Sequence, residues 1–322
     1  MKIVDSHCHI ASMEHTPRSF IEGSIANMLA ALSAQGINVK ASKLMALYED
    51  KMQDPLCDDL VAEMADAGIS KSILLAADFS YALKDCPLSV EESFQSHRKV
   101  MARHPGKLAV FGGVDPRWGK DGIDLFERGL REYGFGGFKV YPPCGFSPSD
   151  PGLFPFYEIC SQYCVPVLVH IGPTSPVLAF DNTRPFNVDE AARLFPRVNF
   201  ILAHGAASFT EECAMMCRYR PNVYMDISGY QVAFSYDPEA TLVRKTVSQG
   251  INHKVLFGTD WPVFRLQGVQ RSCVEALTDE CGPMFELSER EKALIFHQNI
   301  DHLLADGAKV SAARPSTTSN TS

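Results

Sequence analysis

Eight short apolar segments alternate with amphipathic stretches along most of the chain, and this alternation constrains the fold more than any other feature. Most segments are rich in Val, Ile, Leu and Phe with little polar alternation, which is typical of parallel strands covered on both faces. Eight such strands separated by helices predict an α/β fold, a (β/α)8 TIM barrel. The expected strands are Lys2–His9, Ser70–Ala77, Lys107–Val114, Gly136–Tyr141, Val165–Ile171, Val198–His204, Asn222–Ile227 and Lys254–Gly258.

The spacing of these segments divides the 322 residues into parts. Residues 10–54 are too many for an ordinary loop between a strand and a helix, so we expect a helical insertion that acts as a lid over the strand ends. Residues 1–310 then form one barrel domain, and the small polar residues 311–322 form a disordered tail. A doubly wound sheet is the competing fold, but no glycine-rich phosphate-binding motif follows a strand.

Charge and apolar content exclude several functional classes. The chain has 30 basic and 38 acidic residues, and the net charge of −8 disfavours nucleic acid as a partner. No run approaches about 18 apolar residues and the N-terminus lacks a signal-peptide pattern, so no membrane partner is expected. The ten cysteines form no CxxC motif, which predicts reduced thiols in a cytoplasmic protein.

Polar, titratable side chains follow several of the apolar segments. His7 and His9 end the first strand on one face, roughly 6.5–7 Å apart. His170, His204 and Asp260 close the expected strands five, six and eight. A polar group after a run of buried aliphatic residues is costly unless it is bound or paired. Because barrel closure makes the carboxyl ends of the strands neighbours, this pattern predicts a metal site.

These motifs resemble the metal-dependent amidohydrolase superfamily, and within it the amidohydrolase 2 group, which includes aminocarboxymuconate-semialdehyde decarboxylase. The resemblance covers residues 2 to about 304 and rests on His7-x-His9, His170, His204 and Gly-Thr-Asp260-Trp-Pro. It implies that His204 is catalytic. Because many relatives are dimers, it also implies that this chain forms a homodimer. It also implies one divalent metal ion with four ligands, which are His7, His9, His170 and Asp260.

This ligand set implies an expected chemistry. Three imidazoles and one carboxylate suit zinc best, with manganese or cobalt as substitutes. Metal-bound water has a pKa of about 7, Asp260 can accept its proton, and His204 can position the substrate or donate a proton. The first expected function is a hydrolase acting on a lactone, amide or similar carbonyl of a carboxylated or cyclic small molecule. The alternative is a non-oxidative decarboxylase of an aromatic or dienoic acid, in which a carbon is protonated.

Four residues are expected to contact the small-molecule substrate: Lys139, Tyr141, Arg184 and Trp261. Lys139 ends strand four as an anion or water contact, and an ion pair with Asp115 is the competing interpretation. Arg184 can bind a carboxylate, whereas Tyr141 and Trp261 can form an apolar wall. The other candidates are Phe20, Glu22, Phe146, Phe180, Phe264 and Arg265 on loops or the insertion, and Asp226 and Ser228 as supporting residues.

Two further functions are open on the residues alone. A metal-dependent deoxyribonuclease also begins its barrel with His-x-His, but strand eight here reads Gly-Thr-Asp instead of Glu-Thr-Asp. A non-catalytic barrel could keep the metal as a structural or partner-binding element. The presence of His204 beside the ligand set disfavours this second function, because a structural metal site closes its shell and needs no adjacent base.

Overall fold

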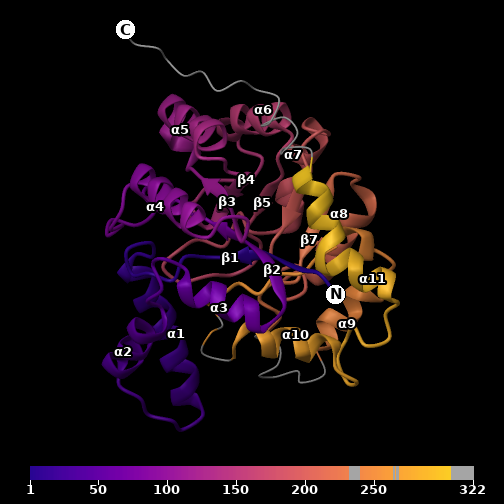
Figure 1. The fold of residues 1–322 in the computed structure, drawn as a ribbon. Helices are drawn as coiled ribbons and strands as arrows, with labels where there is room; N and C mark the ends of the chain where they lie inside the picture. The colour runs from indigo at the N-terminus through magenta and orange to yellow at the C-terminus, as the bar shows by residue number, and fades with distance from the viewer. Residues whose placement is uncertain (232–239, 264, 266–267, 306–322) are drawn as a thin grey trace.

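The strands form a single parallel sheet. The computed structural model describes residues 1–231, 240–263, 265 and 268–305. Its strands are β1 Ile3–Cys8, β2 Ile69–Leu75, β3 Leu108–Gly113, β4 Gly137–Val140, β5 Val167–Val169, β6 Phe200–Leu202, β7 Val223–Asp226 and β8 Val255–Leu256. They lie in the order β1 to β8, so each strand pairs with the next one along the chain (Figure 1). This order confirms the (β/α)8 TIM barrel predicted from the sequence.

Hydrogen bonds bring the end of β8 beside the end of β1. The backbone N–H of Asp260 donates to the carbonyl of His7 at 2.8 Å. The backbone N–H of His9 donates to the carbonyl of Trp261 at 2.7 Å. Residues separated by some 250 positions therefore meet at one rim of the barrel.

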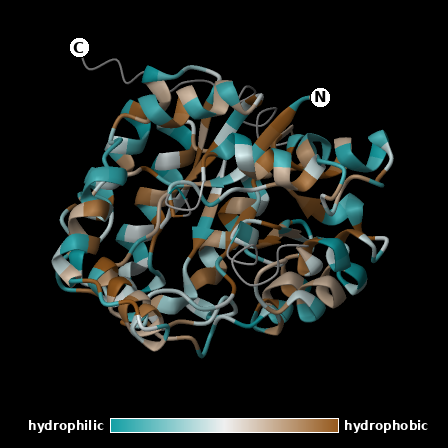
Figure 2. Ribbon diagram, turned by 90° about the horizontal axis from the view of Figure 1, so that it is seen from below, coloured by the Kyte–Doolittle hydropathy of each residue, from teal (hydrophilic) through white to brown (hydrophobic). Residues whose placement is uncertain are grey.

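Helices follow the strands and cover the outside of the barrel, where hydrophilic residues predominate, while the central strands are hydrophobic (Figure 2). The chain enters α4 through a capping box, in which Ser89 and Glu92 bond to each other's backbone N–H. The helices around the barrel are α3 Asp58–Asp66, α4 Val90–Arg103, α5 Gly119–Glu132, α6 Phe154–Tyr163, α7 Asp189–Leu194, α8 Thr210–Tyr219, α9 Thr241–Val247, α10 Gln270–Thr278 and α11 Glu289–Ala293.

Alternation along the strands brings polar side chains to the carboxyl rim. Leu168 of β5 and Tyr224 of β7 belong to one buried apolar cluster. Side chains two residues apart on a strand share a face, so His170 and Asp226 continue the faces of these two residues. Lys139 of β4 is paired in register with Leu168 and lies on the same side of the sheet. This face therefore changes from apolar to polar toward the carboxyl ends.

The insertion between β1 and α3 is helical, as predicted. It contains α1 Arg18–Ala34 and α2 Ala41–Lys51, which pack against each other around Ile21, Ile25 and Met45 (Figure 1). An isolated bridge between Ala11 and Asp54 joins its two ends. The insertion also contacts the loop after β5, because Ser175 Oγ donates to the carbonyl of Phe20 at 2.6 Å.

Three further sequence predictions concern a membrane span, the C-terminal tail and the cysteines. No helix in the described residues is long and apolar enough to span a membrane. The predicted tail 311–322 lies outside the described residues. The ten cysteines are all free, and seven of them are buried.

Candidate metal centre

Four histidines and one aspartate meet at the carboxyl ends of the strands. His7 and His9 come from the end of β1, and their ring centroids lie 5.3 Å apart. The ring of His204, after β6, lies 4.6 Å from that of His7 and 4.9 Å from that of His170, after β5. Asp260 follows β8. The structure therefore brings together the five side chains on which the metal prediction rests.

The carboxylate of Asp260 faces two imidazole nitrogens. Its Oδ1 lies 3.2 Å from His9 Nε2 and 3.4 Å from His7 Nε2. Ligand atoms of His7, His204 and Asp260 all lie within 4.8 Å of one another, and the three residues are buried. Imidazole nitrogens and a carboxylate oxygen at such separations can share one metal ion.

Hydrogen bonds on the other side of each ring determine the protonation of these nitrogens. His9 Nδ1 lies 3.0 Å from the carbonyl oxygen of Leu75, which can only accept, so Nδ1 carries the proton. His7 Nδ1 lies 2.9 Å from Asp226 Oδ2 and donates to that carboxylate. In neutral rings, both Nε2 atoms are then unprotonated, and both face Asp260.

The donor set of these residues fits a divalent cation. Burial lowers the pKa of His7 to about 4, against the opposing charges of nearby carboxylates, so the ring is neutral at pH 7. Burial would raise the pKa of Asp260, but the rings of His7 and His9 help to hold it well below its usual range. His7 Nε2 is buried without a hydrogen-bond partner. Nitrogen lone pairs beside an ionised carboxylate repel it unless a cation lies between them.

Asp226, at the end of β7, holds the cluster through hydrogen bonds. Its Oδ1 accepts the backbone N–H groups of His204 and Ser228, both at 2.9 Å. Its Oδ2 accepts from His7 Nδ1. Burial would raise the pKa of Asp226, but His7 above all lowers it to about 2, so this carboxylate is ionised at neutral pH.

His170 and His204 lie close enough to exchange roles. His204 Nε2 is 3.3 Å from His170 Nδ1, and His170 Nε2 is buried without a hydrogen-bond partner. The group of three ligand atoms within 4.8 Å of one another includes His204, whereas the sequence resemblance assigns the metal to His170. The assignment of His170 as a ligand and of His204 as a catalytic residue stays a prediction.

The backbone is strained at two residues of the cluster. His204 has a φ of 61° and Asp260 a φ of 57°, in the left-handed region that residues other than glycine rarely adopt. Such a conformation costs about 1 kcal/mol or more and persists where the surrounding structure imposes it. Glycine would relieve the strain at either position, but it would also remove the imidazole or the carboxylate. The chain therefore keeps the strained residue together with its side chain.

Lys139 is a buried cation without a hydrogen-bond partner among the described residues. Its side chain is 1 % exposed, and its Nζ lies 5.7 Å from the centroid of the Tyr141 ring. The competing ion pair with Asp115 is absent, because that carboxylate binds Arg117 at 2.6 Å. Burial lowers the pKa of Lys139 to about 8, and the charges of Asp260 and Asp226 oppose this shift. An unpaired buried ammonium is costly, and it is available to bind an anion.

Aromatic residues extend from the cluster on one side. The ring of Tyr141 lies 4.7 Å from that of His170, as expected for a residue at the end of β4. Phe79, which lies 5.2 Å from Tyr141, was not predicted from the sequence. Tyr48 of α2 was also not predicted, and burial together with the charge of Asp260 raises its pKa to about 12. Both come from segments whose path over the barrel no sequence motif indicates.

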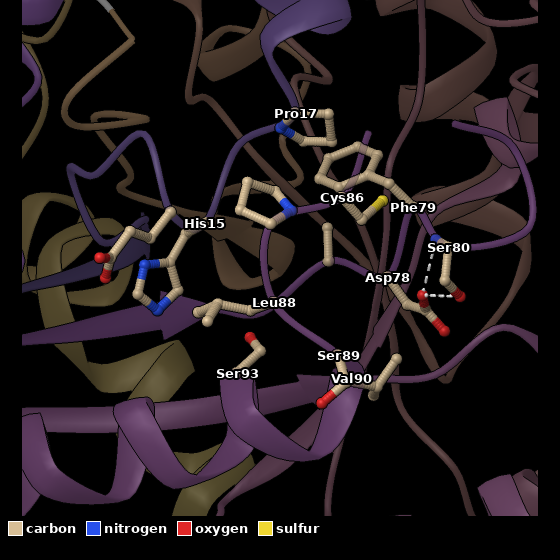
Figure 3. A pocket seen from close by; sticks show the side chains of 13 residues that line it. His15, Pro17, Asp78, Phe79, Ser80, Cys86, Leu88, Ser89, Val90 and Ser93 are labelled. Carbon is tan, nitrogen blue, oxygen red and sulfur yellow. Dashed lines mark hydrogen bonds between the residues drawn. The ribbon is translucent and has the colours of Figure 1, made fainter. Parts of the chain in front are cut away.

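A pocket opens beside Phe79, between the start of the insertion and the loop after β2 (Figure 3). His15 lines it from the insertion, and Asp78 and Cys86 line it from the loop. The ring of Phe20 in α1 lies 5.5 Å from that of Phe79. The insertion therefore contacts the aromatic side of the cluster through Phe20, and its role as a lid stays a prediction.

The side chains of Arg184 and Trp261 bind acidic residues of the covering helices, and their role as substrate contacts stays a prediction. The side chain of Arg184 is 58 % exposed and forms an ion pair with Glu212 of α8. The indole N–H of Trp261 donates to Glu63 of α3 at 3.3 Å. Arg184 and Trp261 are thus each bound by an acidic residue of a covering helix.

The remaining predicted contacts have other partners, are exposed or packed in the core, or lie outside the described residues. Glu22 forms an ion pair with Arg18, and Arg265 forms one with Glu63. Phe180 is 45 % exposed. The remaining two are Phe146, which is buried in the main apolar core, and Phe264, which lies outside the described residues.

Comparison with protein families identifies the family of the chain. A family model described as Amidohydrolase matches residues 4–304. The chain belongs to the amidohydrolase family. A stretch of 99 residues in this amidohydrolase, 31 % of the chain, is 23 % identical to protein fluG of Emericella nidulans. The match covers 11 % of the length of that protein.

Solved structures share the barrel of this amidohydrolase over nearly its whole length. An uncharacterized TIM-barrel protein of Bordetella bronchiseptica has a TM-score of 0.68 at 19 % identity, covering 96 % of this chain and 100 % of that one. A 2,6-dihydroxybenzoate decarboxylase from Rhizobium has a TM-score of 0.63 at 14 % identity, covering 94 % and 98 %.

Two further structures differ from each other in activity. A 5-carboxyvanillate decarboxylase of Novosphingobium aromaticivorans, complexed with manganese and a nitrobenzoic acid, has a TM-score of 0.62 at 14 % identity and covers 94 % and 95 %. A 4-oxalomesaconate hydratase of Rhodopseudomonas palustris has the same TM-score and identity and covers 97 % and 98 %. At these identities the likeness shows the fold, and the activities are those of the compared proteins.

Proposed function

We propose that this amidohydrolase is a metal-dependent decarboxylase of an aromatic carboxylic acid. The observation that carries the proposal is Lys139, a buried ammonium without a described hydrogen-bond partner, which lies near enough to Asp260 and Asp226 to feel the charges of both carboxylates. A buried cation beside a metal centre favours an anionic substrate such as a carboxylate. Aromatic acids are the substrates of two of the structurally similar enzymes.

The proposed metal ligands are His7, His9, His170 and Asp260. Three imidazoles and one carboxylate suit zinc, and manganese is present in one of the similar decarboxylases. When bound, the ion neutralises negative charge on the substrate oxygens and fixes their position. The unprotonated Nε2 atoms of His7 and His9 are already directed toward the Asp260 carboxylate, as such a site requires.

The residues of the chain supply the remaining chemistry. Lys139 Nζ binds the carboxylate that leaves as carbon dioxide, and the rings of Tyr141 and Phe79 pack against a planar substrate. His204, whose Nε2 is unprotonated at rest, takes up a proton from water at that atom and delivers it to the ring carbon. The carbon–carbon bond then breaks, its electron pair restores the ring, and one proton has replaced one carboxylate.

Hydrolysis of a lactone or amide is the second candidate. It ranked first on sequence motifs, and the family description favours it. The structural neighbours described above include two decarboxylases and a hydratase, so we rank decarboxylation before hydrolysis. Asp260 would then accept a proton from water instead of only holding the metal.

A two-substrate assay tests the proposal. The protein is stripped of metal, reloaded with manganese or zinc, and incubated separately with hydroxybenzoates that carry a carboxyl group and with a set of lactones. We expect release of carbon dioxide and, in D₂O, one deuterium at the carbon that lost the carboxyl group. Asp260→Asn is the inactive control. Lactone opening without release of carbon dioxide from any hydroxybenzoate would overturn the proposal in favour of hydrolysis.

A further inference from the structure

Ser228 follows β7 and lies between two histidines of the cluster. Its hydroxyl oxygen is 3.0 Å from His7 Nδ1 and 2.9 Å from His204 Nδ1, and the residue is fully buried. The same hydroxyl contacts Asp226 Oδ1. A serine hydroxyl has one proton to donate and two lone pairs that accept. Its three neighbours therefore determine where the proton points and which groups the lone pairs accept from.

The hydroxyl proton points to the carboxylate. Asp226 Oδ1 already accepts the backbone N–H groups of His204 and Ser228, so it is an acceptor for the hydroxyl as well. The two lone pairs of the hydroxyl are then left for the two rings, and both Nδ1 atoms donate to it. A second contact also indicates that His204 Nδ1 carries a proton. This atom lies 3.3 Å from the carbonyl oxygen of Ser228, which can only accept.

We propose that Ser228 is a positioning residue that holds His7 and His204 with their protons on Nδ1, so that Nε2 of both rings is unprotonated toward the reaction site. This inference rests on the proposed function for its catalytic consequence, but the protonation of the rings does not depend on the substrate. A ring with the proton on Nε2 could neither bind a metal through that atom nor take up a proton there.

The two histidines depend on Ser228 to different degrees. His7 Nδ1 has a second acceptor at 2.9 Å in Asp226 Oδ2, so its ring keeps its protonation without the hydroxyl. His204 Nδ1 is left with the carbonyl at 3.3 Å, a weaker bond. Ser228→Ala should therefore leave metal affinity within about threefold while lowering kcat roughly 10–100-fold, the usual effect of removing a group that orients a metal-site residue.

Nitrogen NMR of the histidine rings tests the proposal directly. In the full chain labelled with ¹⁵N-histidine, with and without zinc, we expect His7 and His204 to show the Nδ1-protonated pattern, assigned by His7→Asn and His204→Asn. In Ser228→Ala we expect the His204 signals to move toward a mixture of the two protonated forms, while the His7 signals stay. Nε2-protonated His204 in the unchanged protein would overturn the proposal without any variant.

Ser6→Ala is the matched control. Ser6 is also fully buried at β1, and its hydroxyl donates to the carbonyl of Phe257 at 2.7 Å without contacting an imidazole. We expect Ser6→Ala to leave the His204 signals and kcat unchanged. Equal changes in both serine variants, or an unchanged His204 in Ser228→Ala, would contradict the proposal. The NMR measurement requires no turnover. It therefore tests the role of Ser228 even if the decarboxylase assay fails.

Discussion

The described part of the chain contains two groups of histidines whose rings contact one another, and their surroundings differ. In the metal centre, His7 contacts two carboxylates, those of Asp226 and Asp260. In the second group, His15 of the insertion and His97 of α4 have ring centroids 5.4 Å apart. Neither ring of this second group forms an ion pair with a described carboxylate.

The comparison shows what distinguishes a metal centre from buried histidines in general. Burial lowers the pKa of His15 to about 4 and of His97 to about 3, much as it lowers that of His7. Each group also contains ring nitrogens without hydrogen-bond partners. Neutral imidazoles with free lone pairs thus occur in both groups, and the carboxylate of Asp260 is what adds the negative charge that a divalent cation needs.

The largest expected effect follows from removing one histidine of each group. His7→Ala should lower metal affinity by more than about 100-fold and reduce turnover to background, because it removes a proposed ligand. His97→Ala should keep the metal. Elemental analysis after dialysis, together with turnover, checks both variants, and equal metal loss in the two would remove the distinction between the groups.

The next effect separates His170 from His204 within the metal centre. His204→Asn should keep its metal and lose roughly 100-fold or more in kcat, because it removes a proton carrier. His170→Asn should lose the metal. Metal titration of both variants checks the assignment, which reverses if His204→Asn releases the ion and His170→Asn retains it.

Lys139 should show an effect on binding of about 10-fold or more. Lys139→Met should raise KM for a carboxylate substrate by this factor, because the ammonium that binds the anion is gone. In the unchanged protein KM should rise as the pH passes about 8, where Lys139 loses its proton, and the variant should show no such rise. KM measured from pH 6.5 to 9 checks this, and parallel profiles would contradict it.

The same substitution should stabilise the protein. Each unit by which burial lowers a lysine pKa costs about 1.4 kcal/mol, and the pKa of Lys139 falls from 10.5 to about 8. Lys139→Met should therefore raise the free energy of unfolding at pH 7 by about 3 kcal/mol, as measured by urea denaturation of the metal-free protein. A lower value in the variant would show that the ammonium is well solvated.

The smallest expected effect concerns acid stability. The folded-state pKa of His97 is about 3 against 6.5 for the free side chain, so between these pH values the unfolded state binds a proton that the folded state does not. Stability therefore falls as the pH decreases from 6.5. His97→Phe should reduce this slope by about 1.4 kcal/mol per pH unit, as measured by denaturation from pH 4.5 to 6.5.

Sequence reasoning succeeded where the local pattern and the barrel order together determine position. His170 and Asp260 follow strands β5 and β8, so their place at the carboxyl rim follows from the fold. It could not reach the contacts of loop residues whose position depends on a distant partner. Trp261 binds Glu63, which is 198 positions away, and no local sequence pattern indicates this contact.

The amino-acid sequence by itself determined the barrel and the chemical types at its rim, because strand periodicity and apolar composition act over a few neighbouring residues. Only the tertiary structure decided which ring nitrogens carry protons. That choice depends on acceptors within about 3 Å, and for His9 and His7 these are the carbonyl of Leu75 and the carboxylate of Asp226, which come from other strands. Hydrogen bonds act only over this short range, so contacts between distant parts of the chain exist only once the barrel has closed.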